Sequence, residues 1–274
     1  MPAAAVPLVC PQVVAHRGSS VDEPEHTRSA YARALDEGAE ALECDVRLTA
    51  DGHLVCVHDR RVDRTSTGRG AVSTLPLADL ERWDFSSWKQ PWADLDDDLD
   101  EVPPGAVLTF EGLCAMVRDH DRVVQVAVET KHPTRYAGLV ERRLVEVLRR
   151  FGWAHAVPDR PARVRVMSFS WMSLRRVREW APSVPTVFLM DRVPLRYRDG
   201  SLPLGSRIAG PSIDIVRAHP SYVARAHARG HRVHVWTVND VADVELCLRL
   251  GVDAVITDNP AEVGRLLTRS GSGG

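Results

Sequence analysis

Short apolar runs alternate with amphipathic segments along most of this chain. Apolar runs of four to eight residues are typical of buried strands, and apolar positions repeated every three or four residues predict helices. The expected strands cover residues 12–16, 39–46, 122–129, 163–169, 185–190, 212–216, 231–238 and 253–258. The expected helices cover residues 27–38, 110–119, 136–151, 172–180, 219–229, 240–250 and 260–268, with Thr27 as N-cap and Gly38 as stop of the first.

Repeated strand–helix units predict an α/β protein with a parallel sheet. Eight such units favour a closed (β/α)₈ TIM barrel, although an open doubly wound sheet has the same pattern. In a barrel the chemistry lies at the C-terminal ends of the strands. Polar residues fall at these ends and support the barrel, namely His16, Glu43, Asp45, Glu129 and Trp236.

Residues 60–105 interrupt this rhythm and end in the acidic, proline-rich run "DLDDDLDEVPPG". A connection of this length inside a compact domain is usually a functional loop or a small subdomain, and a solvated excursion is the simpler alternative. We therefore expect a leader at residues 1–11 and a flexible tail at residues 269–274. Between them, residues 12–268 form the barrel and contain 60–105 as an inserted subdomain.

The stretch "ALECDVRLTADGHLVCVHD" at residues 41–59 brings acids and a histidine together. Glu43 and Asp45 are two residues apart, so on a strand their side chains share a face. Asp51-Gly52 marks a hairpin turn. The short return cannot be a parallel crossover, so 54–58 must run antiparallel to the preceding strand and place His58 opposite residues 44–45.

Two neighbouring carboxylates facing a barrel interior repel each other and are costly to bury. A divalent cation that prefers oxygen ligands, Ca²⁺ or Mg²⁺, would offset this cost. Arg partners holding the two acids would do so as well, and the spacing alone does not decide. Glu129 adds a third candidate ligand, and Lys131, one of two lysines in the chain, shares its face. A structural ion pair is the alternative for these two residues.

His16 and Arg17 follow the first expected strand, which should neighbour the second. His16 and His58 can therefore flank one pocket. Two imidazoles beside a cation suit phosphodiester cleavage, because one accepts a proton from the nucleophile and the other protonates the leaving alkoxide. Arg17 and the cation would stabilise charge on the phosphoryl oxygens.

The composition is that of an ordinary globular protein, with 274 residues, 44% hydrophobic residues and a net charge of −2. This charge does not point to nucleic acid as a partner. The five cysteines lack metal-ligand spacing and fit a reducing compartment. The N-terminus has no basic start and no long apolar core, and no run is long enough to span a membrane. We expect a cytoplasmic protein.

The chain resembles the glycerophosphodiester phosphodiesterases of the phospholipase C-like superfamily. The motifs that carry the resemblance, in the family's order, are "VVAHRG", "PEHT", "ALECDVRLTADGHLVCVHD", "VAVETK", "VMSFSW", "VHVWTVND" and "GVDAVITDNP". They cover residues 12–262, and the motifs of the first half are the specific ones.

This resemblance implies a phospholipase C-like barrel that hydrolyses glycerophosphodiesters to sn-glycerol 3-phosphate and an alcohol, using one divalent cation, Ca²⁺ or Mg²⁺. It also implies that the segment after the second strand is an inserted subdomain. By the family pattern, His16 and His58 are the acid–base pair, Glu43, Asp45 and Glu129 are metal ligands, and Arg17, Lys131 and Trp236 contact the substrate.

The chain departs from the family pattern where Pro24-Glu25-His26-Thr27 replaces the usual Pro-Glu-Asn-Thr. Asn there can cap the following helix and bond the loop that carries His16, and His does both less well. His26 is also a third titrating group near the site. We expect the change to perturb loop order without abolishing catalysis.

Three tryptophans of the inserted segment, Trp83, Trp88 and Trp92, bear on the substrate. They either knit the subdomain together or touch a lysolipid or a membrane surface. Lysophospholipase D activity is therefore the alternative function, and a catalytically silent metabolite-binding barrel is another. A silent barrel does not need two histidines beside three acids. A metal-free phospholipase C is disfavoured because three unpaired acids would repel an anionic substrate.

Overall fold

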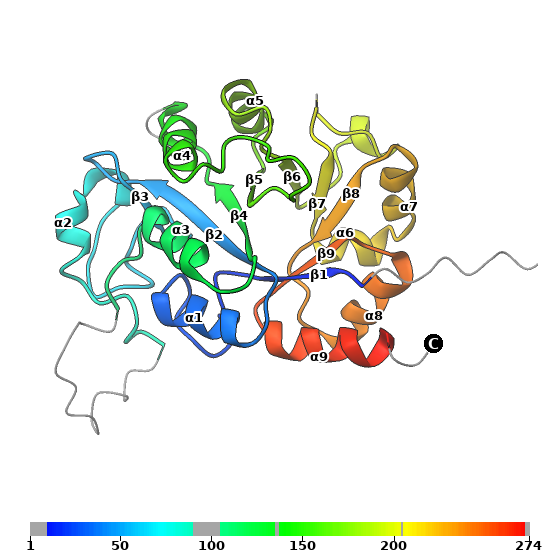
Figure 1. The fold of residues 1–274 in the computed structure, drawn as a ribbon, viewed down its shortest axis with the longest axis horizontal. Coiled ribbons are helices and arrows are strands. Elements are labelled where there is room, and N and C mark those ends of the chain that lie inside the picture. Colours follow the sequence, from blue (N-terminus) through cyan, green and yellow to red (C-terminus); the bar gives the residue numbers. More distant parts are fainter. Residues whose placement is uncertain (1–9, 90–104, 135–136, 204, 272–274) are drawn as a thin grey trace, which may run out of the picture.

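The computed structural model describes residues 10–89, 105–134, 137–203 and 205–271. Nine strands of this part form one sheet in the order β1-β9-β8-β7-β6-β5-β4-β2-β3, and β1 also pairs with β2. That last pairing closes the sheet, with Val14 opposite Ala41, and every pairing except β2 with β3 is parallel. The chain is thus a (β/α)₈ TIM barrel with helices outside the strands, as predicted (Figure 1).

The strands are β1 (Gln12–Ala15), β2 (Ala41–Leu48), β3 (Leu54–Cys56), β4 (Gln125–Thr130), β5 (Val164–Ser168), β6 (Thr186–Met190), β7 (Ile208–Pro211), β8 (Arg232–Val235) and β9 (Ala254–Thr257). The α-helices are α1 (Arg28–Asp36), α2 (Leu77–Leu80), α3 (Phe110–Asp119), α4 (Leu139–Arg150), α5 (Trp171–Trp180), α6 (Ile213–Ala218), α7 (Ser221–Ala228), α8 (Val241–Leu250) and α9 (Pro260–Gly271). None of the helices in the described ranges is long and apolar enough to cross a membrane. Helix α9 continues through Gly271, three residues into the expected tail.

Side-chain oxygens cap several helices that follow a strand or loop. The hydroxyl of Thr27 accepts the N–H of Ala30 at the start of α1, which confirms the predicted cap. The expected strand at residues 212–216 is wrong. Ser212 caps α6 by accepting the N–H of Ile215, and the strand lies earlier, at Ile208–Pro211. The competing signal was Ser212 itself, because a Ser before an apolar run begins a helix as readily as it precedes a strand.

Alternate strand residues fill the barrel interior in layers. The middle of the interior is apolar and buried, and its residues are Val14, Ala41, Ala127, Met167, Val187, Leu189, Ile208, Ala254 and Ile256. The opposite faces of the strands pack against the helices in a second, larger core. The apolar middle layer separates the polar groups at the two ends of the barrel, so each end forms its own site.

The β2–β3 hairpin leaves the barrel and carries the start of the inserted segment. Val46 pairs with Cys56 in antiparallel register, and the Val57 N–H bonds to the Asp45 carbonyl oxygen at 3.1 Å. His58 follows directly and lies where the hairpin predicted it. In Figure 1 this hairpin and α2 lie together to one side of the barrel strands.

The described part of the inserted segment shares a small core with β3 and the residues next to it, formed by Val55, Val57, Val62, Val72, Leu80, Phe85 and Val107. Trp83 packs against this core and covers Gly68, where a Cβ would lie 2.0 Å from the indole. Trp88 is partly exposed, and its indole lies 5.9 Å from the Arg64 guanidinium carbon. Trp83 therefore knits the segment together. Trp92 lies outside the described residues, and contact with a lipid surface stays a prediction.

A polar cluster lies at the N-terminal end of the barrel. The Arg165 guanidinium donates to the side-chain oxygens of Gln12 and Gln125 at 2.9 and 3.1 Å. His234 is buried on β8, and burial together with the positive charge of Arg165 holds its pKa well below the usual value. His234 is therefore neutral in the folded protein at neutral pH.

We expect this histidine to make the fold acid-sensitive. Because the folded-state pKa is lowered, the unfolded chain binds an extra proton as pH falls below about 6.5, and stability is lost on the acid side. Between pH 7 and 5 the loss is up to about 2 kcal/mol in the free energy of unfolding. In urea unfolding, the free energy of unfolding of His234→Gln should depend less on pH than that of the wild type. His53→Gln, at an exposed site, should show the pH dependence of the wild type. Equal slopes for all three proteins would contradict this prediction.

Candidate active site

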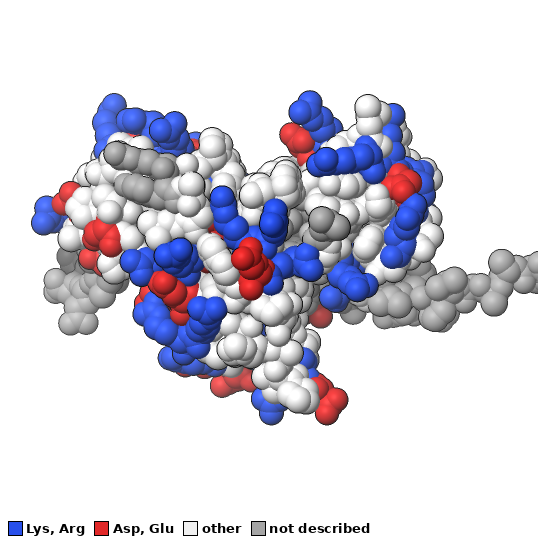
Figure 2. Space-filling model, turned by 90° about the horizontal axis from the view of Figure 1, so that it is seen from above, with Lys and Arg blue, Asp and Glu red and all other residues white. Residues whose placement is uncertain are grey.

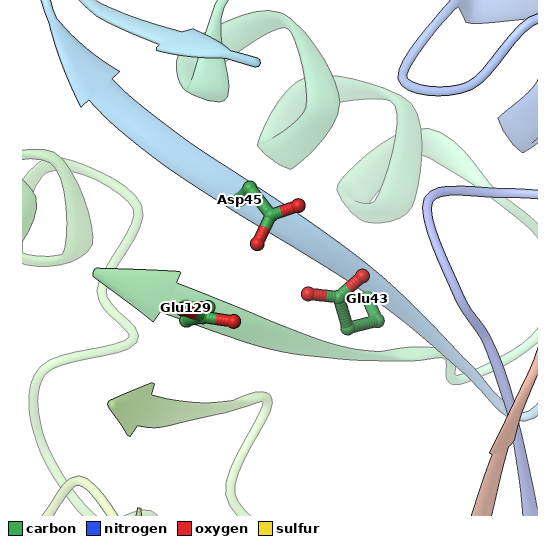
Figure 3. Close-up of side chains that lie close together, drawn as sticks. All are labelled: Glu43, Asp45 and Glu129. Carbon is green, nitrogen blue, oxygen red and sulfur yellow. The ribbon is translucent and has the colours of Figure 1, made fainter. Parts of the chain in front are cut away.

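Three carboxylates from two adjacent strands meet at the C-terminal end of the barrel. Glu43 and Asp45 lie on β2, Glu129 lies on β4, and the register places Asp45 opposite Glu129. A carboxylate oxygen of each residue lies within 4.8 Å of the other two, and all three side chains are buried. Figure 3 shows the three carboxyl groups turned toward one another. The alternation of side chains along β2 explains why both of its acids face this interior.

Two cationic side chains contact Asp45 and Glu129. The Lys131 ammonium lies 2.9 Å from both Asp45 Oδ1 and Glu129 Oε1, and Arg17 Nε lies 3.2 Å from Asp45 Oδ2. The backbone N–H of Arg17 also donates to Glu43 Oε2 at 3.1 Å. Arg and Lys partners therefore hold the acids in part, as one of the sequence alternatives proposed.

The positive charge is unevenly shared among the acids. Burial opposes ionisation of Asp45, yet Lys131, His26 and Arg17 hold its pKa well below the usual value. Burial and the charge of Asp45 raise the pKa of Glu43 well above its usual value and that of Glu129 to about 7. Glu43 and Glu129 thus lack enough nearby positive charge to stabilise their ionised forms. Clustered carboxylate oxygens of this kind suit Ca²⁺ or Mg²⁺, so the residues present fit the predicted cation.

His16 follows β1 and faces the carboxylates. Its Nε2 lies 4.0 Å from Glu43 Oε2, and its Nδ1 lies 2.6 Å from Asp258 Oδ1. Asp258 is held by the Ser20 hydroxyl at 3.0 Å and by the Asn239 side-chain amide at 2.7 Å. Hydrogen bonds and the charge of His16 outweigh burial and lower the pKa of Asp258 to about 2. Asp258 is therefore an anion that orients the imidazole.

His58 enters from the other side, at the end of the hairpin. Its Nδ1 lies 2.8 Å from Asp59 Oδ1, and Arg64 Nε donates to Asp59 Oδ2 at 2.6 Å. Arg47 donates two hydrogen bonds to the His58 carbonyl oxygen, at 2.9 and 2.6 Å, and so fixes its backbone. Burial lowers the pKa of His58.

His26 lies beneath the carboxylates rather than at the helix cap, which Thr27 supplies. Its Nε2 lies 3.0 Å from Asp45 Oδ2, its Nδ1 lies 2.8 Å from the Tyr31 hydroxyl oxygen, and its N–H donates to the Arg17 carbonyl oxygen. The expected loss of capping was therefore wrong. Residue 26 has a φ of 64°, a region in which Asn is enriched, which gives a physical reason for the usual Asn of the family motif.

A cavity of about 150 Å³ lies over these groups. The predicted residues His16, Arg17, Glu43, His58, Glu129, Lys131 and Trp236 all line it, and Asp45 lies behind them. Its apolar wall includes Phe169, whose ring packs edge-on against Trp236 with centroids 5.4 Å apart. All eight predicted site residues are thus brought to one place.

Asp258, Asp59 and Phe169 were missed from the sequence. Asp258 and Phe169 each follow a strand directly, β9 and β5, and the rule that chemistry lies at these ends would have found them. Asp59 directly follows His58, and an Asp beside a His in the sequence indicates a carboxylate partner for the imidazole.

Comparison with known proteins bears on this geometry. The model of the "Glycerophosphoryl diester phosphodiesterase family" matches residues 16–262. The chain belongs to this family. It is accordingly a phosphoric diester hydrolase, as the sequence motifs predicted.

Relatives and solved structures agree with this assignment. The chain is 44% identical over 257 residues to "Probable glycerophosphodiester phosphodiesterase 1" of Mycobacterium tuberculosis, which covers 91% of this chain and 90% of the relative. It is 32% identical to the glycerophosphodiester phosphodiesterase of Bacillus subtilis, over 90% of this chain and 83% of the relative. A phosphodiesterase of Oleispira antarctica, solved with the product sn-glycerol-3-phosphate, is 25% identical with a TM-score of 0.79. This likeness covers 94% of this chain and 97% of that one.

We predict that Ca²⁺ or Mg²⁺ raises the melting temperature and that the increase depends on the carboxylates. A ligand at 100 times its Kd stabilises a fold by about 2.7 kcal/mol. In Glu43→Gln the increase should largely disappear. The substitution removes one ligand, and it also removes the repulsion between Glu43 and the other two acids that the cation would otherwise relieve. Glu146→Gln, at an exposed acid paired with Arg143, should respond like the wild type. A full response of Glu43→Gln in calorimetry would rule out this cation site.

Proposed function

We propose that the protein hydrolyses glycerophosphodiesters to sn-glycerol 3-phosphate and an alcohol, with one divalent cation and two histidines. One observation carries this proposal: His16 and His58, each with its own carboxylate partner, flank three buried acids at the C-terminal end of the barrel. The product bound by the similar Oleispira antarctica enzyme supports the same substrate class.

Glu43, Asp45 and Glu129 would hold the cation. Bound there, Ca²⁺ or Mg²⁺ supplies positive charge that stabilises the phosphoryl oxygens as negative charge develops. Arg17 and Lys131 add to this field from the protein, because both cations line the cavity beside the carboxylates. They bind and orient the phosphodiester between the two imidazoles.

We assign His58 as the base. Burial lowers the pKa of His58, so its imidazole is mostly neutral at neutral pH and can accept the proton of the attacking oxygen. Asp59, which holds Nδ1, shares its charge with Arg64 and so favours a protonated ring less than a free carboxylate would.

We assign His16 as the acid. Asp258 contacts its Nδ1, and no Arg or Lys in the part of the chain that the structure describes forms an ion pair with Asp258. Asp258 therefore accepts the hydrogen bond of Nδ1–H and orients the ring so that Nε2 can deliver a proton to the leaving alkoxide. The glycerol half fits the small cavity beside Trp236 and Phe169.

The first test is release of sn-glycerol 3-phosphate from glycerophosphocholine by the purified protein. We expect release with Ca²⁺ or Mg²⁺, none with EDTA, and a loss of roughly 10²–10⁴-fold in kcat for His16→Ala and His58→Ala. His53→Gln serves as the control histidine variant because His53 is exposed outside the cavity. Release that persists in EDTA would refute metal dependence, and no release with either metal would turn attention to lysophospholipids.

The assignment of acid and base is tested with leaving groups. A p-nitrophenyl ester of glycerol 3-phosphate has a leaving group that needs no protonation, so it bypasses the acid but still needs the base. His16→Ala should therefore lose much less activity on this ester than on glycerophosphocholine. His58→Ala should lose similar activity on both substrates. The reverse pattern would exchange the two roles.

A further inference from the structure

A second cavity adjoins the catalytic one and has a different character. It measures about 200 Å³ and lies between the β2–β3 hairpin, the start of the inserted segment and the loop after β4. Lys131 lines both cavities, so the two meet at its side chain. The other charged residues on its wall are Arg47 and Arg60, and no Asp or Glu is among its described lining residues.

Two of these three cations, Arg47 and Arg60, keep some capacity for an anion. Arg47 is fixed by donating Nε and Nη2 to the His58 carbonyl oxygen, a neutral group, and it forms no ion pair with any carboxylate of the described residues. Arg60 is exposed and forms no ion pair with any residue that the structure describes. Lys131 is paired with Asp45 and Glu129 and marks the boundary with the catalytic cavity.

We propose that this cavity, hereafter the basic subsite, binds a phosphate group carried by the alcohol half of the substrate. The inference rests on the proposed function, since it extends the substrate from the same cleavage site. The catalytic cavity of about 150 Å³ has room for the glycerol phosphate half, and the basic subsite, which meets it at Lys131, is the adjoining cavity that can receive the alcohol half. The preferred substrates are then glycerophosphodiesters of a phosphorylated polyol.

The charge and size of the basic subsite argue against the other alcohol groups. A quaternary ammonium such as choline would lie beside two arginines and be repelled. Acyl chains need more space, because pockets for larger ligands measure about 300–1,000 Å³. Phosphate matches the arginine fork by charge-assisted hydrogen bonds, and Thr134 on the same wall carries a hydroxyl that suits a polyol.

Figure 2 shows basic side chains in several separate groups on the face seen from above in Figure 1, rather than in one continuous band. General attraction of anions is therefore weak, consistent with the net charge of −2. The preference should come from the basic subsite itself and should weaken with added salt.

The experiment compares two substrates that differ by one phosphate, glycerophosphoinositol and glycerophosphoinositol 4-phosphate. We expect kcat/KM to be roughly tenfold higher for the phosphorylated substrate, the effect of one charge-assisted hydrogen bond. Arg60→Gln should bring this ratio near one, because it should lower kcat/KM much more for the phosphorylated substrate than for glycerophosphoinositol. Arg61→Gln, a neighbouring arginine paired with Asp63 outside the cavity, should keep the wild-type ratio.

The outcomes separate the two proposals. Turnover of both substrates at equal kcat/KM would overturn the basic subsite while leaving the proposed function standing. If neither substrate is turned over, release from glycerophosphocholine decides the proposed function, and calorimetric binding of both compounds with Ca²⁺ present decides the subsite. Tighter binding of the phosphorylated compound that is lost in Arg60→Gln but not in Arg61→Gln supports it, and equal binding overturns it.

Discussion

The close approach of three buried carboxylates at the C-terminal end of the barrel is the constraint on which the rest of the site depends. Glu43, Asp45 and Glu129 are buried and close together, so their mutual repulsion has to be offset within a few ångströms. Arg17 and Lys131 supply part of the positive charge, and the raised pKa of Glu43 and Glu129 shows that the compensation is incomplete. This uncompensated repulsion favours the binding of a divalent cation. The same excess of negative charge holds the side chains of Arg17 and Lys131 in place.

The apolar interior of the barrel allows the fold to tolerate the repulsion among the three carboxylates. The apolar layer that contains Val14, Ala127 and Met167 is packed across the barrel below the acids, so the repulsion acts on one end only. The cluster around Arg165 occupies the opposite end. Stability and chemistry are thus carried by different layers of the same strands, and substitutions at one end need not disturb the other.

Much of the candidate site was predictable from the local sequence pattern. Strand alternation places Glu43 and Asp45 on one face, and the Asp51-Gly52 turn returns the chain so that His58 reaches them. What the pattern could not supply is contact between distant segments: His16 with Asp258, or His26 with Asp45 and Tyr31. The error at residues 212–216 has a similar origin, because a helix and a strand are both compatible with a short apolar run until the neighbouring strand selects one.

The longest strand shows how the barrel makes room for the site. β2 pairs with β1 through Ala41 and Leu42 and with β3 from Val46 onward, so its outer edge changes partner between these points. Glu43 lies in the gap, where the loop after β1 can approach and the Arg17 N–H can reach the carboxylate. The same loop also packs closely on α1, because a Cβ on Gly18 would lie 2.6 Å from the Ala30 backbone, and only glycine fits there. The change of partner along β2 therefore sets where the acids, both imidazoles and the basic subsite can meet.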